Sequence, residues 1–373
     1  MTSALFSPVH IGPVQLANRV GVSPMCQYSA DDGCANDWHL MHLMQLAISG
    51  AGLVILEATA TERHARITHG CLGLYNDACE AALARVMAAA RRVAAANTRW
   101  GIQLNHAGRK ASTQRPWEGR GALDATEDPW QTEAPSAEAG GPGWHVPKEM
   151  SATDMGRVRD GFVAAAGRAV RLGFDVVELH AAHGYLIHQF LSPLANRRTD
   201  AFGGCLENRM RFPLELAKAI REALPRSIAF GVRLTGTDWL PSGIVVEEAV
   251  TFSAALKTLG ADFVCVTSGG VAHARIPVGP NYQVPFAKEV KEKTGMPTQA
   301  VGMIAEAHQA EAVIASGDAD MVAIARAFLD NPRWVWHAAE KLGATESLIY
   351  PPQYERSRPA LWAGTRLARP GAT

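Results

Sequence analysis

The amino-acid sequence predicts a single α/β domain, residues 1–373, folded as a (β/α)8 TIM barrel. Three observations lead to this prediction. Short runs rich in Val, Ile and Leu alternate with amphipathic stretches of helical length, which indicates parallel strands joined by crossover helices. Eight such units can be counted, the number that closes a barrel of this kind. At 373 residues, of which 47% are hydrophobic, the chain is long enough to bury one large core.

The predicted strands are spaced so that a helix fits between most neighbouring pairs. They are residues 19–25, 52–58, 100–105, 175–180, 228–234, 263–268, 297–301 and 321–325. Helical patterns with apolar residues on one side lie between them and would form the outer ring. The clearest of these patterns are residues 77–95, 155–172, 212–224, 247–259 and 284–294.

Two segments depart from the repeating unit. Residues 6–18 precede the first strand and contain turn formers such as Pro8 and Gly12, so we expect an N-terminal hairpin that closes the barrel floor. Residues 111–150 follow the third strand and are rich in Pro, Gly and Trp. They are too long for an ordinary βα loop, which predicts a capping excursion over the barrel mouth.

Composition narrows the classes of partner and site. Lys plus Arg and Asp plus Glu both number 36, so neither nucleic acid nor a membrane surface is an expected partner. The N-terminus lacks a basic flank followed by an apolar run, and we expect a cytoplasmic protein. The 6 cysteines show no CxxC spacing, which argues against a zinc or iron-sulfur site.

Polar motifs follow the predicted strands, at the end of the barrel where active sites of this fold lie. The motif SPMCQY follows the first strand, NHAGRK the third and HAAHGY the fourth. GVRL lies within the fifth strand, and VGMI and ARAF follow the seventh and eighth. We therefore expect one constellation of side chains on one face.

These motifs resemble the Old Yellow Enzyme family in its shorter bacterial branch, over nearly the whole chain. The matching segments, in order, are SPMCQY, NHAGRKAS, ELHAAHGYLIHQFLSPLANRRTDAFGGCLENRMRF and PPQYERS. The resemblance implies an FMN-dependent oxidoreductase with ping-pong kinetics. NADPH or NADH would supply hydride, and electron-poor alkenes (enones, enals and maleimides), quinones or nitro compounds would accept it. No GxGxxG motif opens a strand-helix unit, which favours FMN over FAD.

The phosphate of such a cofactor needs backbone N–H groups and a fixed cation from the loops after the last two strands. Gly302 and Arg326 occupy these loops, and the resemblance assigns them to the FMN phosphate. Ala325 stands where many relatives have glycine. An arginine at position 326 that only caps the next helix is the alternative.

The flavin ring needs a positive group near its pyrimidine end, which gathers negative charge on reduction. Arg233 lies in an otherwise apolar strand, where an unpartnered charge is costly, and Gln103 is the candidate amide. Gln103 alone is equally compatible with a satisfied core amide. The resemblance places Pro24, Met25 and Ala60 against the ring through their backbone.

Cys26 directly follows the first strand. The resemblance implies that its thiol tunes the flavin potential through a weak hydrogen bond and is not a nucleophile. A buried free cysteine is more often inert filling, and this is the alternative.

His180, His183 and Tyr185 follow the fourth strand. A pair of histidines three residues apart suggests metal ligands in isolation, but no third ligand stands at a matching spacing. The resemblance implies instead that both imidazoles hold a substrate carbonyl oxygen and that Tyr185 is the proton donor. Tyr28 would orient the carbonyl, and the alternative for either tyrosine is that it only lines the pocket.

Tyr354 and Arg356 lie in the tail, residues 345–373, beyond the eighth unit. In relatives the matching arginine reaches the neighbouring active site across a dimer interface. The resemblance therefore implies a homodimer or homotetramer in which Arg356 acts in trans and Tyr354 lies at the pocket rim. A solvated arginine on a frayed terminus is the alternative.

Three other functions are alternatives to an FMN-dependent oxidoreductase. A flavin-free phosphate-binding isomerase or aldolase would use the same two phosphate loops. A flavin-binding redox sensor would signal through Cys26 but leave the histidine pair without a task. Dienoyl-CoA reductases and amine dehydrogenases carry an appended cluster-bearing domain, for which this chain lacks the length and the clustered cysteines.

Overall fold

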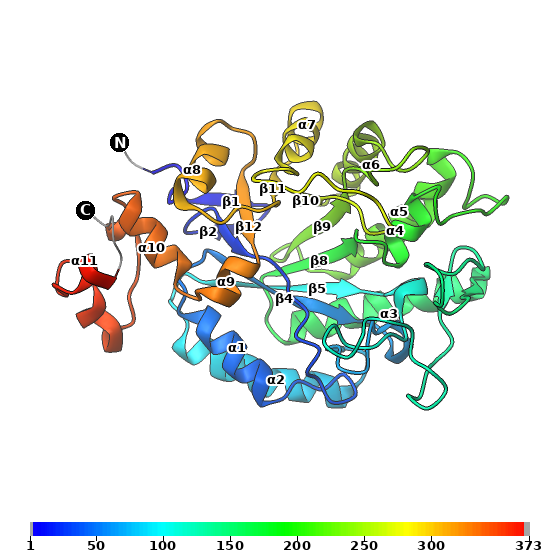
Figure 1. Cartoon of the computed structure of the whole chain (residues 1–373), viewed down its shortest axis with the longest axis horizontal. Coiled ribbons are helices and arrows are strands. Elements are labelled where there is room, and N and C mark those ends of the chain that lie inside the picture. Colours follow the sequence, from blue (N-terminus) through cyan, green and yellow to red (C-terminus); the bar gives the residue numbers. More distant parts are fainter. Residues whose placement is uncertain (1–2, 369–373) are drawn as a thin grey trace.

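The computed structural model describes residues 3–368 and contains the predicted closed barrel of eight parallel strands (Figure 1). Pairing of the last strand with the first, Val322 opposite Val20, closes the barrel. Each strand is a nearly continuous buried run because helices cover its outer face and side chains fill the interior. The strands are β3 (Val20–Val22), β4 (Leu53–Ala60), β5 (Arg99–Asn105), β8 (Val176–Ala181), β9 (Ala229–Thr235), β10 (Phe263–Thr267), β11 (Thr298–Ala300) and β12 (Met321–Ile324).

The prediction for the first strand was wrong at its carboxyl end. We expected residues 19–25, but β3 ends at Val22. The amide of Ser23 still donates to the carbonyl of Ile324 at 2.9 Å. Pro24 has no N–H to continue the ladder, so the chain turns away from the barrel there. This early exit frees residues 24–28 to line the mouth.

The helices form the outer ring, and all five predicted helices are confirmed. α3 begins at Ala152 rather than 155, because Ser151 and Asp154 form a capping box. α5 begins at Leu206 rather than 212, with Pro213 inside the helix. The helices are α1 (Asp37–Ala47), α2 (Asp77–Val93), α3 (Ala152–Arg171), α4 (Leu186–Leu191), α5 (Leu206–Ala223), α6 (Val246–Thr258), α7 (Val284–Thr294), α8 (Ala307–Ala315), α9 (Arg326–Asp330), α10 (Trp334–Lys341) and α11 (Thr365–Ala368).

The N-terminal hairpin is also confirmed. β1 (Val9–Ile11) and β2 (Val14–Leu16) pair antiparallel. Ile11, Val14 and Leu16 pack in one apolar cluster with side chains from the barrel strands, including Leu53 and Phe263. The hairpin therefore seals the floor, the end of the barrel opposite the polar motifs.

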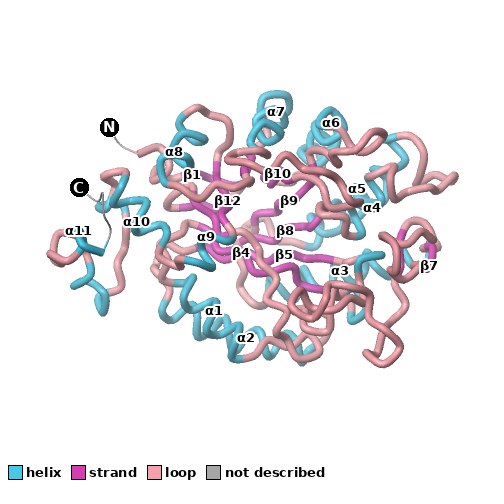
Figure 2. The backbone as a smooth tube through the Cα atoms, viewed as in Figure 1, coloured by secondary structure: helices cyan, strands magenta, loops and turns pink. Residues whose placement is uncertain are grey.

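Residues 111–150 run mostly as loop, with only β6 (Glu133–Ala134) and β7 (Lys148–Glu149) paired to each other (Figure 2). Two hydrogen bonds fasten the excursion over the mouth. Nε of Arg115 donates to the carbonyl of Tyr28 at 3.0 Å, and Oγ1 of Thr113 donates to the carbonyl of Ile67 at 2.9 Å. The excursion thus covers the loops that follow β3 and β4, as expected.

None of the helices described here combines the length and the apolarity that a membrane span requires. The 6 cysteines are all free thiols. Residues 369–373, the end of the expected tail, lie outside the described residues.

Candidate active site

The histidine pair forms one hydrogen-bonded chain at the carboxyl end of β8. Nδ1 of His180 lies 3.3 Å from the amide of Ala182, which makes it an acceptor and leaves the proton on Nε2. That Nε2 lies 3.3 Å from Nδ1 of His183, and Nε2 of His183 lies 3.0 Å from Oγ1 of Thr267. Burial, and next the charge of Arg233, lower the pKa of both imidazoles well below 6.5, so both are neutral at pH 7.

In this arrangement Nε2 of His180 donates to Nδ1 of His183, and Nε2 of His183 faces Oγ1 of Thr267, so the two donors do not point to one common point. A substrate oxygen held by both rings therefore has to replace at least one of these contacts. The sequence analysis expected both donors to bind the substrate oxygen at once. In the structure, both donors are already engaged within the protein.

Tyr185 lies beside the pair, with its ring centroid 5.0 Å from that of His180. Burial raises the pKa of its phenol well above 10, so the hydroxyl keeps its proton at neutral pH. Tyr185 also packs in one apolar cluster with Cys26, Tyr28 and Ile67. The structure thus brings the motifs after β3 and β8 together.

Lys110 is a residue for which the sequence analysis found no role, although it belongs to the quoted motif NHAGRKAS. Its Nζ lies 5.1 Å from the centre of the Tyr185 ring. The same Nζ donates to the carbonyls of His183 at 2.8 Å and Gly270 at 3.2 Å. Burial, and next Arg109, lower the pKa of Lys110 to about 8. Lys110 therefore ties two mouth loops together beneath the tyrosine.

A second group that the sequence analysis missed is fully buried behind Tyr185. Nδ1 of His188 accepts from the amide of Gly184 at 2.8 Å, so Nε2 carries the proton and donates to Oδ1 of Asp238 at 2.9 Å. Oγ of Ser192 donates to Oδ2 of the same aspartate at 2.7 Å. The group holds the turn that carries Tyr185. Only tertiary contact reveals it, because Asp238 follows a different strand.

Arg233 and Gln103 face the barrel interior from β9 and β5. Nη1 of Arg233 donates to Oγ of Ser23 at 3.0 Å, but its buried Nε has no hydrogen-bond partner. Nε2 of Gln103 donates to Oε1 of Glu178 at 2.7 Å. The amide nitrogen is thereby committed, and the amide oxygen is left as the free acceptor.

Cys26 and Tyr28 lie at the mouth after β3. Burial, and next Cys71 and Glu57, raise the pKa of the Cys26 thiol well above 9. Tyr28 has a left-handed φ of 51°, and burial also raises the pKa of its phenol. Cys26 therefore stays a thiol, which suits a weak hydrogen-bond donor and not a nucleophile.

The two loops expected to bind phosphate have different geometries. Gly302 has a φ of 118°, and a Cβ there would lie 2.9 Å from the amide nitrogen of Gln283. Glycine is therefore required at this point. Arg326 is the exposed first residue of α9 and directly follows Ala325. Burial raises the pKa of Tyr282, and the charges of Arg326 and Arg233 both oppose this shift, so the two arginines lie within electrostatic range of the same phenol.

Within residues 3–368, the tail residues Tyr354 and Arg356 are not joined to the rest of the site. The tail lies beyond α10, at the left of Figure 1. Tyr354 is 43% exposed and lines a groove of about 600 Å³ formed with the ends of α1 and α2. Its ring contacts Arg333 and Trp336, and Arg356 is exposed in the short helix η4 (Pro352–Ser357).

Comparison with known proteins identifies the family. The model of a protein family described as "NADH:flavin oxidoreductase / NADH oxidase family" matches residues 4–344. The chain belongs to this family. An NADPH dehydrogenase of Geobacillus thermodenitrificans is 41% identical, covering 95% of this chain and 99% of its own. An NADH:flavin oxidoreductase of Gibberella zeae is 42% identical, covering 92% and 86%. The structure of morphinone reductase superposes with a TM-score of 0.77 at 28% identity, covering 92% of this chain and 91% of its own.

This membership confirms the resemblance to Old Yellow Enzymes and the expected cofactor chemistry. The protein is an oxidoreductase of the NADPH dehydrogenase type that uses FMN and NAD(P)H. The flavin-free isomerase or aldolase is therefore excluded. The chain also fits FMN on its own geometry, because an unpartnered Nε of Arg233, the free amide oxygen of Gln103 and the glycine-only turn at Gly302 are features that a bound flavin explains.

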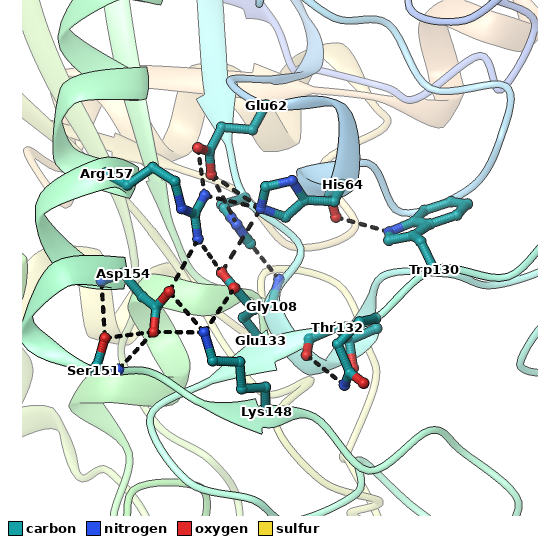
Figure 3. A network of polar contacts seen from close by, with 12 residues as sticks. Glu62, His64, Gly108, Trp130, Thr132, Glu133, Lys148, Ser151, Asp154 and Arg157 are labelled. Carbon is teal, nitrogen blue, oxygen red and sulfur yellow. Dashed lines mark hydrogen bonds and ion pairs between the residues drawn. The ribbon is translucent and has the colours of Figure 1, made fainter.

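The flavin oxidoreductase also contains an ionic cluster beside the mouth, in which Glu62, His64 and His106 each place a potential ligand atom within 4.8 Å of the others (Figure 3). Two contacts argue against a metal ion there. Nδ1 of His106 accepts from the amide of Gly108 at 3.0 Å, so Nε2, the atom facing Glu62, carries the proton. Nη1 of Arg157 lies 2.5 Å from Glu62 and 3.0 Å from His64, and it already supplies positive charge.

Proposed function

We propose that the protein reduces the activated C=C bonds of enones, enals and maleimides, and also reduces quinones or nitro compounds, in a ping-pong cycle. The observation that carries this proposal is the grouping of a neutral histidine pair and a protonated tyrosine, His180, His183 and Tyr185, beside Arg233 at one barrel mouth. FMN, when bound, would supply the hydride-transfer chemistry between the nicotinamide and the alkene. The residues supply binding, orientation and the proton.

The histidine pair would hold the substrate carbonyl. A substrate oxygen would replace the contact between His180 and His183 and accept a hydrogen bond from Nε2–H of His180. A small rotation of His183 away from Thr267 would add a second donor. Both rings are neutral, so they polarise the carbonyl by hydrogen bonding. Each hydrogen-bond donor placed at an oxygen that gains negative charge in the transition state increases the rate by roughly 100 to 1,000 fold.

Tyr185 would give the proton to the alkene carbon that hydride does not reach. Its raised pKa keeps the proton available at pH 7, and the nearby Nζ of Lys110 stabilises the phenolate that is left. Tyr28, which packs in the same apolar cluster as Tyr185, would orient the carbonyl. A cavity of about 330 Å³ between Tyr28 and the excursion, reaching Trp144, gives the substrate a place to enter.

We propose that the remaining residues hold the cofactor. Arg326 and the backbone at Gly302 and Ala325 would bind the phosphate. Arg233 and Gln103 would bind the pyrimidine end of the ring, where an arginine stabilises the charge of the reduced form. The ring would also contact the backbone of Pro24, Met25 and Ala60 and the thiol of Cys26.

Separating the two half-reactions tests this function. Tyr185→Phe removes only the proton donor, so stopped-flow reduction of the flavin by NADPH or NADH should stay close to the wild-type rate. Reoxidation by an enone should slow by roughly 100 to 10,000 fold, whereas quinones, which take protons from solvent, should be affected much less.

Tyr75→Phe is the matched control, because its phenol donates to the carbonyl of Asp32 and is not one of the residues proposed to bind substrate or flavin. This variant should leave both half-reactions unchanged. Equal slowing of the two half-reactions by Tyr185→Phe would show that Tyr185 only shapes the pocket.

A further inference from the structure

A buried carboxyl group lies inside the barrel, next to the residues proposed to bind the flavin ring. Glu178 is on β8, two residues before His180, and its exposed fraction is 0%. Gln103 is its register partner on β5 and donates Nε2 to Oε1 of Glu178 at 2.7 Å. The second carboxyl oxygen, Oε2, is buried and has no hydrogen-bond partner. A buried acidic oxygen without a partner requires an explanation.

The charges around Glu178 are few. From β9 the guanidinium of Arg233 faces it, from β10 the thiol of Cys265 does, and β5 contributes only the neutral amide of Gln103. Burial raises the pKa of Glu178 to about 6, against the lowering effects of Arg233 and of the Gln103 hydrogen bond. The carboxylate at neutral pH thus depends on the single positive charge of Arg233.

The hydrogen bond to Glu178 also sets the direction of the Gln103 amide. Because Nε2 is held by the carboxylate, Oε1 of Gln103 is the atom left to accept a hydrogen bond from the N–H edge of a flavin ring. Glu178 therefore acts on both ring residues, on Gln103 through a hydrogen bond and on Arg233 through charge.

We propose that Glu178 is a positioning residue that shares Arg233 with the cofactor and takes up one proton at Oε2 when the flavin is reduced. The proposal rests on the placement of Arg233 and Gln103 at the flavin ring. With oxidised flavin, Arg233 and the Glu178 carboxylate neutralise each other. Reduction adds negative charge at the pyrimidine end, and two anions then compete for one cation in a low-dielectric interior. Protonation of Glu178 relieves this repulsion.

The electrons and protons balance without a further reactant. Hydride from NADPH brings two electrons and one proton to the cofactor and leaves NADP⁺. The second proton comes from water and forms the O–H bond at Oε2 of Glu178. Reoxidation by the substrate releases this second proton again.

The midpoint potential of the bound FMN, measured by redox titration between pH 5 and pH 9, tests the proposal. For a two-electron couple each proton taken up changes the potential by about 30 mV per pH unit. Above about pH 6 the wild-type slope should be about 59 mV per pH unit, corresponding to two protons. Glu178→Gln, which keeps an oxygen for Gln103 but cannot ionise, should show about 30 mV per pH unit.

A matched control is Glu80→Gln, which makes the same change on the outer helix α2, where Glu80 pairs with Arg171. It should keep the wild-type slope. If Glu178→Gln raises the potential by the same amount at every pH with an unchanged slope, Glu178 stays ionised and proton uptake is wrong, although the ring placement holds. If neither potential nor slope changes, the placement of the ring residues is wrong as well.

Direct proton counting decides the question even if the variant fails to retain FMN. Wild-type enzyme reduced anaerobically by NADPH in weakly buffered indicator dye should take up one proton per FMN near pH 7.5. The uptake should decline toward zero below about pH 6, where Glu178 is already protonated in the oxidised enzyme. No uptake near pH 7.5 would overturn the proposal.

Discussion

At the scale of single residues, Cys26 carries a prediction that separates tuning from chemistry. Burial raises the pKa of its thiol, so the thiolate needed for a nucleophile is scarce at neutral pH. We expect Cys26→Ser to shift the flavin midpoint potential and to change both half-reaction rates, while multiple turnover continues. Potentiometry and stopped-flow kinetics measure these effects. Complete loss of turnover with normal FMN content would assign Cys26 a chemical step instead.

The same scale shows what sequence reasoning reached and what it missed. Arg233 stood out because a charge inside an apolar strand demands a partner, and the structure leaves its Nε unpartnered. No role was predicted for Lys110, because the motif that contains this lysine does not indicate which carbonyls it will contact. Those carbonyls, from His183 and Gly270, belong to loops far apart in the chain.

At the scale of elements, the ionic cluster joins the excursion to the barrel. Nη1 of Arg157, on α3, contacts Glu62, which follows β4, and Nη2 contacts Glu133 of β6 at 2.5 Å. His64 adds Nε2 between the same two carboxylates, 3.3 Å from Glu62 and 3.7 Å from Glu133. The cluster therefore attaches the excursion to α3 and to the segment that follows β4 (Figure 3).

This cluster predicts a pH dependence of stability. Hydrogen bonding to Glu133 and then Glu62 raises the pKa of His64 from 6.5 to about 9, although Arg157 opposes protonation. A raised folded-state pKa means that the stabilisation is complete below pH 6.5 and is lost as pH rises through about 9. We expect at most about 1 kcal/mol, because the side chain is partly exposed and screened.

Denaturant unfolding of wild type and His64→Gln at several pH values measures this loss. The wild type should be more stable at pH 6, and the two curves should converge above about pH 9. His308→Gln, on the exposed start of α8, is the control for the substitution itself. Curves for wild type and His64→Gln that stay parallel from pH 6 to 10 would remove His64 from the attachment of the cap.

At the scale of the whole molecule, the tail points to a second copy of the chain. Apolar side chains on it are left in solvent, with Ile349 48%, Leu361 63% and Trp362 41% exposed. Clustered exposed apolar groups mark interaction surfaces. Since the described part of the tail, residues 345–368, does not meet the active site of its own chain, we propose a homodimer or homotetramer in which Arg356 completes the neighbouring site and Tyr354 lies at its rim.

Mixing two variants that are each impaired in enone reduction tests the shared site. Arg356→Ala should weaken binding of substrate or nicotinamide while the flavin is retained. When Arg356→Ala subunits exchange with Tyr185→Phe subunits, one of the two sites in each heterodimer has both residues intact, so enone reductase activity should return. Sedimentation and a mass-tagged subunit confirm exchange. A monomer in solution, or no recovery after confirmed exchange, would contradict the proposal.

The sequence by itself determined the barrel, the hairpin, the excursion and the identity of the polar residues at the mouth. These features are written in local patterns: hydrophobic alternation, turn formers and motifs that follow strands. Only the tertiary structure decided which of these residues form hydrogen bonds with one another. His188 meets Asp238, Glu178 meets Gln103 and Lys110 bridges two loops only after eight strands close in register. Hydrogen bonds depend on distances of about 3 Å between residues that are far apart in the chain, which no local pattern encodes.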